Sequence, residues 1–149
     1  MIVGEVETVS VYQARSVFPE MEGDDTVAAL LKFEDGAVGV VTESFSTKTF
    51  KPLSPIGCPT VLNGSSGTIT VRDDELEIYG KNVGDSSICI RKKVEEKDTF
   101  VEETRHFLRC VKSGETPITS GQEERRTLAV ICAGYQSLNK GGVRVKVRY

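Results

Sequence analysis

Histidine and cysteine are the side chains most often used for metal binding and nucleophilic catalysis, and one of each lies within a single helical turn. His106 is the only histidine in the chain, and Cys110 follows it four residues later. This spacing brings both side chains to one face of a helix. A closed zinc site needs four ligands, and no second histidine or CxxC pair is available to complete one. The pair therefore predicts a packed helix flank, with a small metal or thiol site as the weaker alternative.

The remaining cysteines are isolated from one another. Cys58, Cys89 and Cys132 lie too far apart in the sequence to form a CxxC redox or zinc motif. The chain also begins without a basic segment followed by an apolar stretch, and it has no apolar run of membrane-spanning length. Reduced, mostly buried thiols in a cytoplasmic protein are the expectation.

Acidic and glycine-rich segments give no sign of a cofactor or metal site. The clusters at residues 22–25 and 73–75 lack the spacing of a calcium loop. Residues 64–67, Gly-Ser-Ser-Gly, could cradle a phosphate, but a strand pattern follows them and not a helix, so they predict a hairpin turn. GxGxxG and GxxxxGK[ST] motifs are both missing from the sequence. We therefore expect the chain to bind no nucleotide cofactor and no metal by itself, and we assign it no catalytic residue.

One irregular segment concentrates groups that could hold a polar small molecule. Residues 46–58 contain prolines that cannot continue a central strand. Within them, two cations, a hydroxyl and an aromatic ring are adjacent: Lys48, Thr49, Phe50 and Lys51. Loops on rigid scaffolds carry binding residues disproportionately often. These four residues are the candidates for a substrate cleft, and the alternative is that the two lysines simply solvate a connection.

Strand patterns flank this segment on both sides. Alternating or β-branched runs before it predict strands over residues 5–18, 26–33 and 37–45, with Asp35-Gly36 favouring a tight two-residue hairpin between the second and third. After it, short strands are predicted at residues 60–62, 68–71, 76–79 and 87–90, and a final strand carries Val143, Val145 and Val147. Most neighbours are joined by turns short enough for antiparallel pairing.

Two helices are predicted between the short strand at residues 87–90 and the final strand. Apolar residues from Phe100 to Val111 recur at helical spacing behind a Thr99-x-x-Glu102 capping box. A second capping box, Ser120-x-x-Glu123, precedes apolar positions at the same spacing: Leu128, Ile131, Cys132, Tyr135 and Leu138. Helices segregated from strands indicate an α+β fold. We expect a large, mostly antiparallel sheet with the two amphipathic helices on one face and the other face left for a partner.

Composition and charge agree with an ordinary globular domain. The chain has 149 residues, with 22 acidic and 19 basic side chains interspersed and a net charge of −3. That length predicts a single domain over residues 1–149. The interspersed signs create no basic field, so nucleic acid is a poor candidate partner.

Several segments, in this order, resemble the C-terminal domain of the Gfo/Idh/MocA family of NAD(P)-dependent oxidoreductases. The resemblance is carried by the strand start at residues 4–9, the hairpin at residues 24–39, the hairpin at residues 62–71, the helix at residues 100–108 with Gly114 to Thr119 after it, and the helix at residues 128–137. Each segment alone is a common signature. Their order and spacing carry the likeness, which covers nearly the whole chain.

The resemblance implies the C-terminal domain of an enzyme that moves a hydride between nicotinamide and a sugar, a polyol or a related hydroxyl or carbonyl compound. In that family NAD or NADP binds to an N-terminal Rossmann domain, which we expect to be absent from this chain, so the chain alone is expected to be inert. The resemblance also implies that Lys48 to Lys51 line the substrate cleft. It further implies that the open sheet face is a subunit interface of a homo-oligomer, consistent with a twofold dimer. A self-contained scaffold module that assembles through its sheet face is the alternative.

Overall fold

The computed structural model describes residues 3–15, 17–18, 20, 22–23, 25–45, 60–72, 74–80, 89–95 and 97–149. The chain divides into two compact units, one made of Met1–Lys48 with Gly114–Tyr149 and the other of Thr49–Ser113. Each unit has its own four-stranded sheet and one helix. That residues 1–149 form a single domain stays a prediction.

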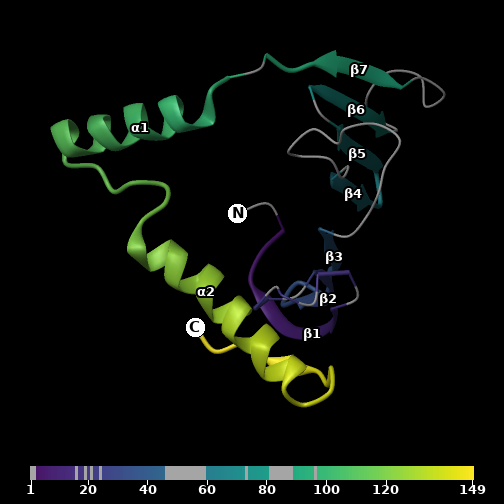
Figure 1. The fold of residues 1–149 in the computed structure, drawn as a ribbon. Helices are drawn as coiled ribbons and strands as arrows, with labels where there is room; N and C mark the ends of the chain where they lie inside the picture. Colours follow the sequence, from purple (N-terminus) through teal and green to yellow (C-terminus); the bar gives the residue numbers. More distant parts are fainter. Residues whose placement is uncertain are drawn as a thin grey trace. The chain divides into compact units, whose positions relative to one another are not determined.

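The first unit is built on a sheet that joins the two ends of the chain. Its strands are β1 (Val6–Ala14), β2 (Thr26–Phe33), β3 (Val38–Ser44) and β8 (Val145–Lys146), in the order β3-β2-β1-β8. Figure 1 labels the first three of these strands. All three pairings are antiparallel. The final strand is shorter than the Val143 to Val147 pattern predicts, since only two of its residues form regular pairs with β1.

The hairpin between β2 and β3 differs by one residue from the predicted turn. The Phe33 amide donates to the Ala37 carbonyl at 2.9 Å, and the Gly36 amide donates to the Phe33 carbonyl at 3.1 Å. The loop therefore contains three residues, 34–36, and Gly36 takes the positive φ of 91° that such a loop needs at its last position. The Asp-Gly pair correctly predicted a hairpin, but the two-residue loop was wrong.

Helix α2 (Gly121–Leu138) packs on β1 and β8 and closes the core of the first unit. The buried core consists of Val6, Val9, Val11, Ala133 and Val147. The helix meets the sheet through small side chains, because Ala133, Gly134 and Ser137 are its buried residues. A Cβ on Gly134 would lie 3.3 Å from a methyl carbon of Val11. The close approach of helix and strand thus depends on these small residues.

The second unit contains a meander of four short strands. These are β4 (Thr60–Gly64), β5 (Gly67–Arg72), β6 (Glu75–Gly80) and β7 (Ile90–Lys93), paired in sequence order and antiparallel throughout. The Gly-Ser-Ser-Gly segment is the predicted hairpin turn, with Gly64 paired to Gly67. A Cβ on Gly67 would lie 2.1 Å from the Tyr79 carbonyl oxygen, so only glycine fits there. Strand β7 begins at Ile90, where the predicted strand ended.

Helix α1 (Thr99–Ser113) completes the second unit. Its N-terminus is capped by Asp98, whose carboxylate accepts from the amides of Phe100 at 3.0 Å and Val101 at 3.2 Å. The capping residue is therefore one position earlier than the predicted Thr99, because a carboxylate is a stronger acceptor for the free amides of the first turn. For α2 the predicted cap is confirmed, since the Ser120 hydroxyl accepts from the Glu123 amide at 3.4 Å.

The α+β class and the antiparallel pairing are confirmed. The described strands form two four-stranded sheets where one large sheet was expected. The break falls at residues 46–59, which contain three prolines and lie outside the described residues. Of the two helices, α2 covers one face of the first sheet, as expected. Neither helix of the described chain is long and apolar enough to cross a membrane.

Candidate functional site

The four residues predicted to line a substrate cleft lie outside the described residues. Lys48, Thr49, Phe50 and Lys51 all belong to residues 46–59, so their arrangement stays a prediction. The structure does describe the strand that leads into them. Strand β3 ends at Ser44, and Phe45 is the last described residue before the segment.

A buried carboxylate fixes the sheet end from which this segment departs. Asp25 is fully buried, and its Oδ2 accepts from the amides of Val17 at 2.8 Å and Phe18 at 3.3 Å. Its backbone carbonyl accepts from the Phe45 amide at 2.8 Å. One residue thus holds both the chain that follows β1 and the chain that follows β3. A scaffold of this kind gives the next residues a defined starting point.

The same sheet end contains two further polar contacts. The hydroxyls of Thr26 and Ser44 lie 3.0 Å apart across β2 and β3. The Arg15 guanidinium donates to the carbonyls of Glu22 at 2.8 Å and Gly23 at 3.2 Å. The Arg15 bonds satisfy carbonyls of the connection between β1 and β2, and the hydroxyl pair joins β2 to β3, so side chains as well as turn geometry order this sheet end.

The sheet face opposite α2 is apolar and exposed. Because side chains alternate along a strand, the cross-strand rows Ser10–Leu30–Val40 and Tyr12–Ala28–Thr42 point away from the helix. We call the exposed residues of this surface the open face: Tyr12, Ala28, Leu30, Val38, Val40 and Thr42. Val38 and Val40 are 67% and 71% exposed, although valine is usually buried in sheets. This is the surface expected to meet a partner.

An ion pair borders the open face. Lys32 on β2 donates to the Glu7 carboxylate on β1. This hydrogen bond, together with the charge of the ammonium group, holds the pKa of Glu7 below its ordinary value. Because both side chains are exposed to solvent, the pair contributes little to stability and defines a polar rim.

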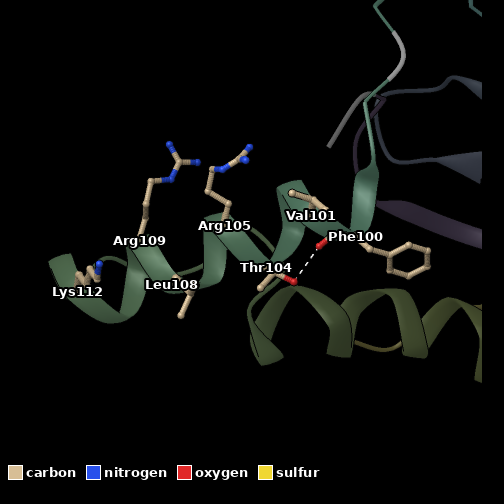
Figure 2. A pocket seen from close by; sticks show the side chains of 7 residues that line it. All are labelled: Phe100, Val101, Thr104, Arg105, Leu108, Arg109 and Lys112. Atoms are coloured by element: carbon tan, nitrogen blue, oxygen red, sulfur yellow. Dashed lines mark hydrogen bonds between the residues drawn. The ribbon is translucent and has the colours of Figure 1, made fainter.

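Helix α1 exposes an apolar stripe beside a row of cations (Figure 2). A hollow of about 550 Å³ along its surface is lined by Phe100, Val101, Thr104, Arg105, Leu108, Arg109 and Lys112. Cys110 is the buried residue of this helix, whereas Phe100 is 78% exposed.

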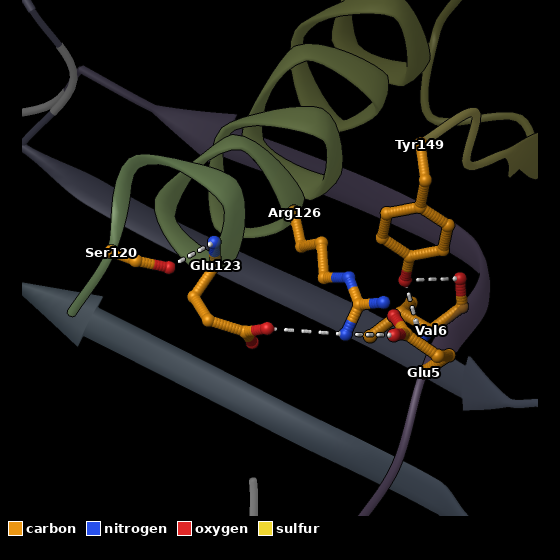
Figure 3. A network of polar contacts seen from close by, with 6 residues as sticks. All are labelled: Glu5, Val6, Ser120, Glu123, Arg126 and Tyr149. Carbon is orange, nitrogen blue, oxygen red and sulfur yellow. Dashed lines mark hydrogen bonds and ion pairs between the residues drawn. The ribbon is translucent and has the colours of Figure 1, made fainter. Parts of the chain in front are cut away.

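A polar network ties the start of β1 to the end of the chain (Figure 3). The Tyr149 hydroxyl accepts from the Val6 amide at 2.8 Å and donates to the Val6 carbonyl at 3.0 Å. Beside it, the Arg126 guanidinium on α2 lies 3.0 Å from the Glu5 carboxylate and 3.5 Å from that of Glu123. These contacts hold the first strand, the helix and the C-terminal residues together.

A groove of about 380 Å³ lies between α2 and the C-terminal residues. Its lining consists of Arg125, Leu128, Ala129, Cys132, Ala133, Gln136, Lys146, Arg148 and Tyr149. Among the described residues, no carboxylate forms an ion pair with Arg125 or Arg148. The groove is therefore apolar at its floor and positively charged at its edges.

The sequence matches a known protein family over almost its whole length. Residues 1–147 match the sequence model of the Gfo/Idh/MocA family described as the C-terminal alpha/beta domain of the oxidoreductase family. The chain belongs to this family. The match extends over both sheets and both helices, so the expected family resemblance is confirmed.

Named relatives of this Gfo/Idh/MocA domain are longer enzymes. D-apiose dehydrogenase of Paraburkholderia graminis is 26% identical over 149 residues, which cover 94% of this chain and 39% of the relative. Myo-inositol 2-dehydrogenase of Thermotoga maritima is 26% identical over 157 residues, covering 93% of this chain and 42% of the relative. The chain thus spans about two fifths of the length of these relatives.

Solved structures agree with the fold of the Gfo/Idh/MocA domain. An oxidoreductase from Agrobacterium radiobacter in complex with NAD+, L-tartaric acid and magnesium has a TM-score of 0.84 at 24% identity, covering 97% of this chain and 44% of that protein. Levoglucosan dehydrogenase in complex with NADH and levoglucosan has a TM-score of 0.84 at 17% identity, with 99% and 46% covered. At these identities the likeness establishes the fold.

The histidine and cysteine of the Gfo/Idh/MocA domain lie close together, as their spacing predicted. The Cys110 sulfur is 3.6 Å from Nε2 of His106. No group of three or more His, Cys, Asp or Glu residues in the described ranges could hold a metal ion. Of the cysteines, Cys110 is buried, Cys89 is half-buried and Cys132 is exposed, and all three are free thiols. The expectation of mostly buried thiols was therefore wrong for Cys132.

Sequence reasoning missed Asp25 and Ser137. Asp25 belongs to the acidic cluster at residues 22–25, to which the sequence assigned no role, yet it is fully buried and organises the sheet end. Ser137 is also fully buried, and its hydroxyl joins α2 to β1. Neither residue has a local sequence signal. The partners of both are backbone groups, and only the fold brings these groups next to the two side chains.

The position of Tyr149 leads to a prediction about alkaline pH. Burial first, and then its hydrogen bond with Glu5, raises the pKa of Tyr149 above its ordinary value. The unfolded chain therefore loses this phenolic proton before the folded chain does. The stabilising contribution is present below about pH 10 and is lost as the pH rises through the folded-state pKa.

Tyr149→Phe should remove this contribution. We expect the wild type to exceed the variant by about 1 kcal/mol in unfolding free energy near neutral pH, because two hydrogen bonds to Val6 are lost. The difference should shrink as the pH rises above about 10, the ordinary pKa of tyrosine. Urea denaturation at each pH measures it, with the exposed Tyr135→Phe as control. A difference that does not change with pH would contradict the prediction.

Proposed function

We propose that this chain is the C-terminal domain of an NAD(P)-dependent oxidoreductase that acts on a sugar, a polyol or a related hydroxyl or carbonyl compound. The observation that carries the proposal is the family match over residues 1–147. Both named relatives, D-apiose dehydrogenase and myo-inositol 2-dehydrogenase, carry polyhydroxylated compounds in their names. Membership thus favours the oxidoreductase over the self-contained scaffold module.

The cofactor would bind to a Rossmann domain elsewhere in the full-length protein. This chain has no glycine-rich loop at a helix start that could cradle a pyrophosphate. NAD is the first cofactor to test, because two structural neighbours were solved with NAD+ or NADH. The nicotinamide, when bound, would accept a hydride from the carbon of a substrate alcohol.

This chain would contribute the binding of the substrate. The ammonium groups of Lys48 and Lys51 can donate hydrogen bonds to hydroxyl oxygens, and the Thr49 hydroxyl can donate or accept. The Phe50 ring offers an apolar surface for the C–H face of a sugar ring. Asp25 would hold the chain at Phe45, from which this segment begins. The proton released from the substrate hydroxyl would need a base from outside this chain.

The test is an assay of the full-length protein with NAD or NADP and a panel of sugars and polyols. Lys48→Ala and Lys51→Ala are expected to lower kcat/KM by roughly 10-fold or more, because each removes a charged hydrogen bond of about 1.5–3 kcal/mol to the substrate. The melting temperature should stay nearly unchanged. Lys112→Ala, on α1, is the matched control. Unchanged kinetics in both lysine variants would leave the segment as a solvated connection.

The assembly and the location form part of the same proposal. The open face would bind a second copy in an isologous pair, since a twofold axis brings the same apolar surface of each subunit together. Free thiols at Cys89, Cys110 and Cys132 agree with a reducing, cytoplasmic environment. The chain alone would bind neither NAD nor NADP, which calorimetric titration with both cofactors would test.

A further inference from the structure

The tip of the β4–β5 hairpin holds an asparagine directly before a glycine. Asn63 and Gly64 are the last two residues of β4, and Gly64 pairs with Gly67 across a two-residue loop. Glycine has no Cβ, so its backbone nitrogen can approach a neighbouring group closely. Here that neighbour is the side-chain amide of Asn63. Strand β4 thus places an electrophilic carbon next to an unhindered backbone nitrogen.

Strand β5 adds a hydrogen-bond donor to this amide. Asn63 lies opposite Thr68 in the antiparallel register, and the Thr68 hydroxyl donates to Oδ1 of Asn63 at 2.9 Å. Attack on the amide carbon would move negative charge onto this same oxygen. A donor already held at hydrogen-bond distance stabilises such a charge as it develops. The strand pairing therefore supplies Asn63 with the kind of donor that an oxyanion hole supplies to a substrate carbonyl.

From these contacts we propose that Asn63 is a site of intramolecular deamidation, with Gly64 as the attacking residue and Thr68 as the donor to the oxyanion. The Gly64 nitrogen bonds to Cγ of Asn63, the Cγ–Nδ2 bond breaks, and Nδ2 leaves as ammonia with the proton of the Gly64 nitrogen. Water then opens the succinimide ring at either of its two carbonyls, which gives aspartate or isoaspartate. Water is the only co-reactant, so the inference is independent of the proposed function.

The position of the pair at the end of the ladder makes the reaction possible in the folded chain. Gly64 and Gly67 form the terminal pair of β4 and β5, and the ends of paired elements open at the lowest free energy. Opening of this pair frees the Gly64 nitrogen, while the next pair, Asn63 with Thr68, still holds the donor in place. All four residues belong to one hairpin of the second unit, so the reaction requires no contact outside it.

Either product changes the hairpin. Aspartate adds one negative charge to a chain whose net charge is −3. Isoaspartate also inserts one carbon into the main chain, which disturbs the register of β4 with β5. The Thr68 hydroxyl can still donate to the new carboxylate, so aspartate should leave the strand pairing closer to its original state than isoaspartate does.

Peptide mass spectrometry of the folded chain, incubated in mildly alkaline buffer, measures the conversion of amide to acid at Asn63. Asn139 is the internal reference, because the residue after it is Lys140, whose side chain hinders attack. Gly64→Ala should slow conversion of Asn63 on the order of tenfold, since an added side chain hinders the attacking geometry. The variant fits the hairpin, because its Cβ would lie 3.5 Å from the Gly67 carbonyl oxygen, an ordinary contact.

Two variants of Thr68 test the donor. Thr68→Val removes the hydroxyl but keeps the branched shape, and it should slow conversion several-fold in the folded chain. Thr68→Ser keeps the hydroxyl and should react close to the wild-type rate. In urea all three proteins should convert equally fast, because the unfolded chain no longer holds the donor at Asn63. Wild-type conversion no faster than at Asn139 would overturn the deamidation site. Conversion of folded Thr68→Val at or above the wild-type rate would overturn the role of the donor.

Discussion

Ser137→Ala is expected to lower the free energy of unfolding by about 3 kcal/mol, because it leaves the buried Val11 amide without a partner and removes a second bond, to the part-buried Val143 carbonyl. The Ser137 hydroxyl accepts from the Val11 amide at 3.0 Å and donates to the Val143 carbonyl at 2.7 Å. The side chain is fully buried, so water cannot replace it. One hydroxyl thus links α2, the central strand β1 and the segment that leads to β8.

Urea denaturation followed by circular dichroism measures this effect. Ser120→Ala is the matched control, because it removes a serine hydroxyl from the exposed N-terminus of the same helix and should cost only about 1 kcal/mol. Equal losses in the two variants would show that Ser137 is not a structural link between helix and strand.

Val40→Lys is expected to convert a dimer of this chain into a monomer. Val40 lies on the open face, next to Leu30 of β2 in the same cross-strand row. In an isologous pair each copy would bring one new ammonium group into the interface. Burying like charges costs several kcal/mol, and about 3 kcal/mol would weaken the dimer by roughly 100-fold.

The matched control is the neighbouring residue on the same strand. Val41 pairs with Ala29 and points to the α2 side of the sheet, and it is itself half exposed. Val41→Lys should therefore leave the association unchanged. Light scattering over a range of concentrations measures both variants. A wild-type chain that stays monomeric at high micromolar concentration would refute the open face as an autonomous association surface.

The open face shows which surfaces a sequence can specify. Alternation along residues 38–44 placed Val38 and Val40 on one side and left that side without a partner, and the structure confirms that both valines are exposed. The side-chain period of a strand is two, so the assignment of faces follows from the sequence once the strand is recognised. The predicted substrate segment, residues 48–51, was chosen by its composition, its place after the strand at residues 37–45 and the family resemblance, and it lies outside the described residues.

Helix α2 shows the opposite case. The apolar positions that predicted this helix do not all face the sheet: Leu138 packs against the core, whereas Leu128, Ile131, Cys132 and Tyr135 are exposed. The sheet instead contacts Ala133, Gly134 and Ser137. Periodicity identifies an apolar stripe, but it does not say which of two stripes packs on the protein's own sheet.

The sequence by itself determined the α+β class, both helices, the hairpin turns and the family, because each depends on local patterns and on their order along the chain. Only the tertiary structure decided the break into two sheets, the burial of Asp25 and the link through Ser137. These depend on contacts between residues far apart in sequence. Ser137 and Val11 are separated by 126 positions. No local sequence pattern can therefore indicate that the Ser137 hydroxyl accepts a hydrogen bond from the Val11 amide.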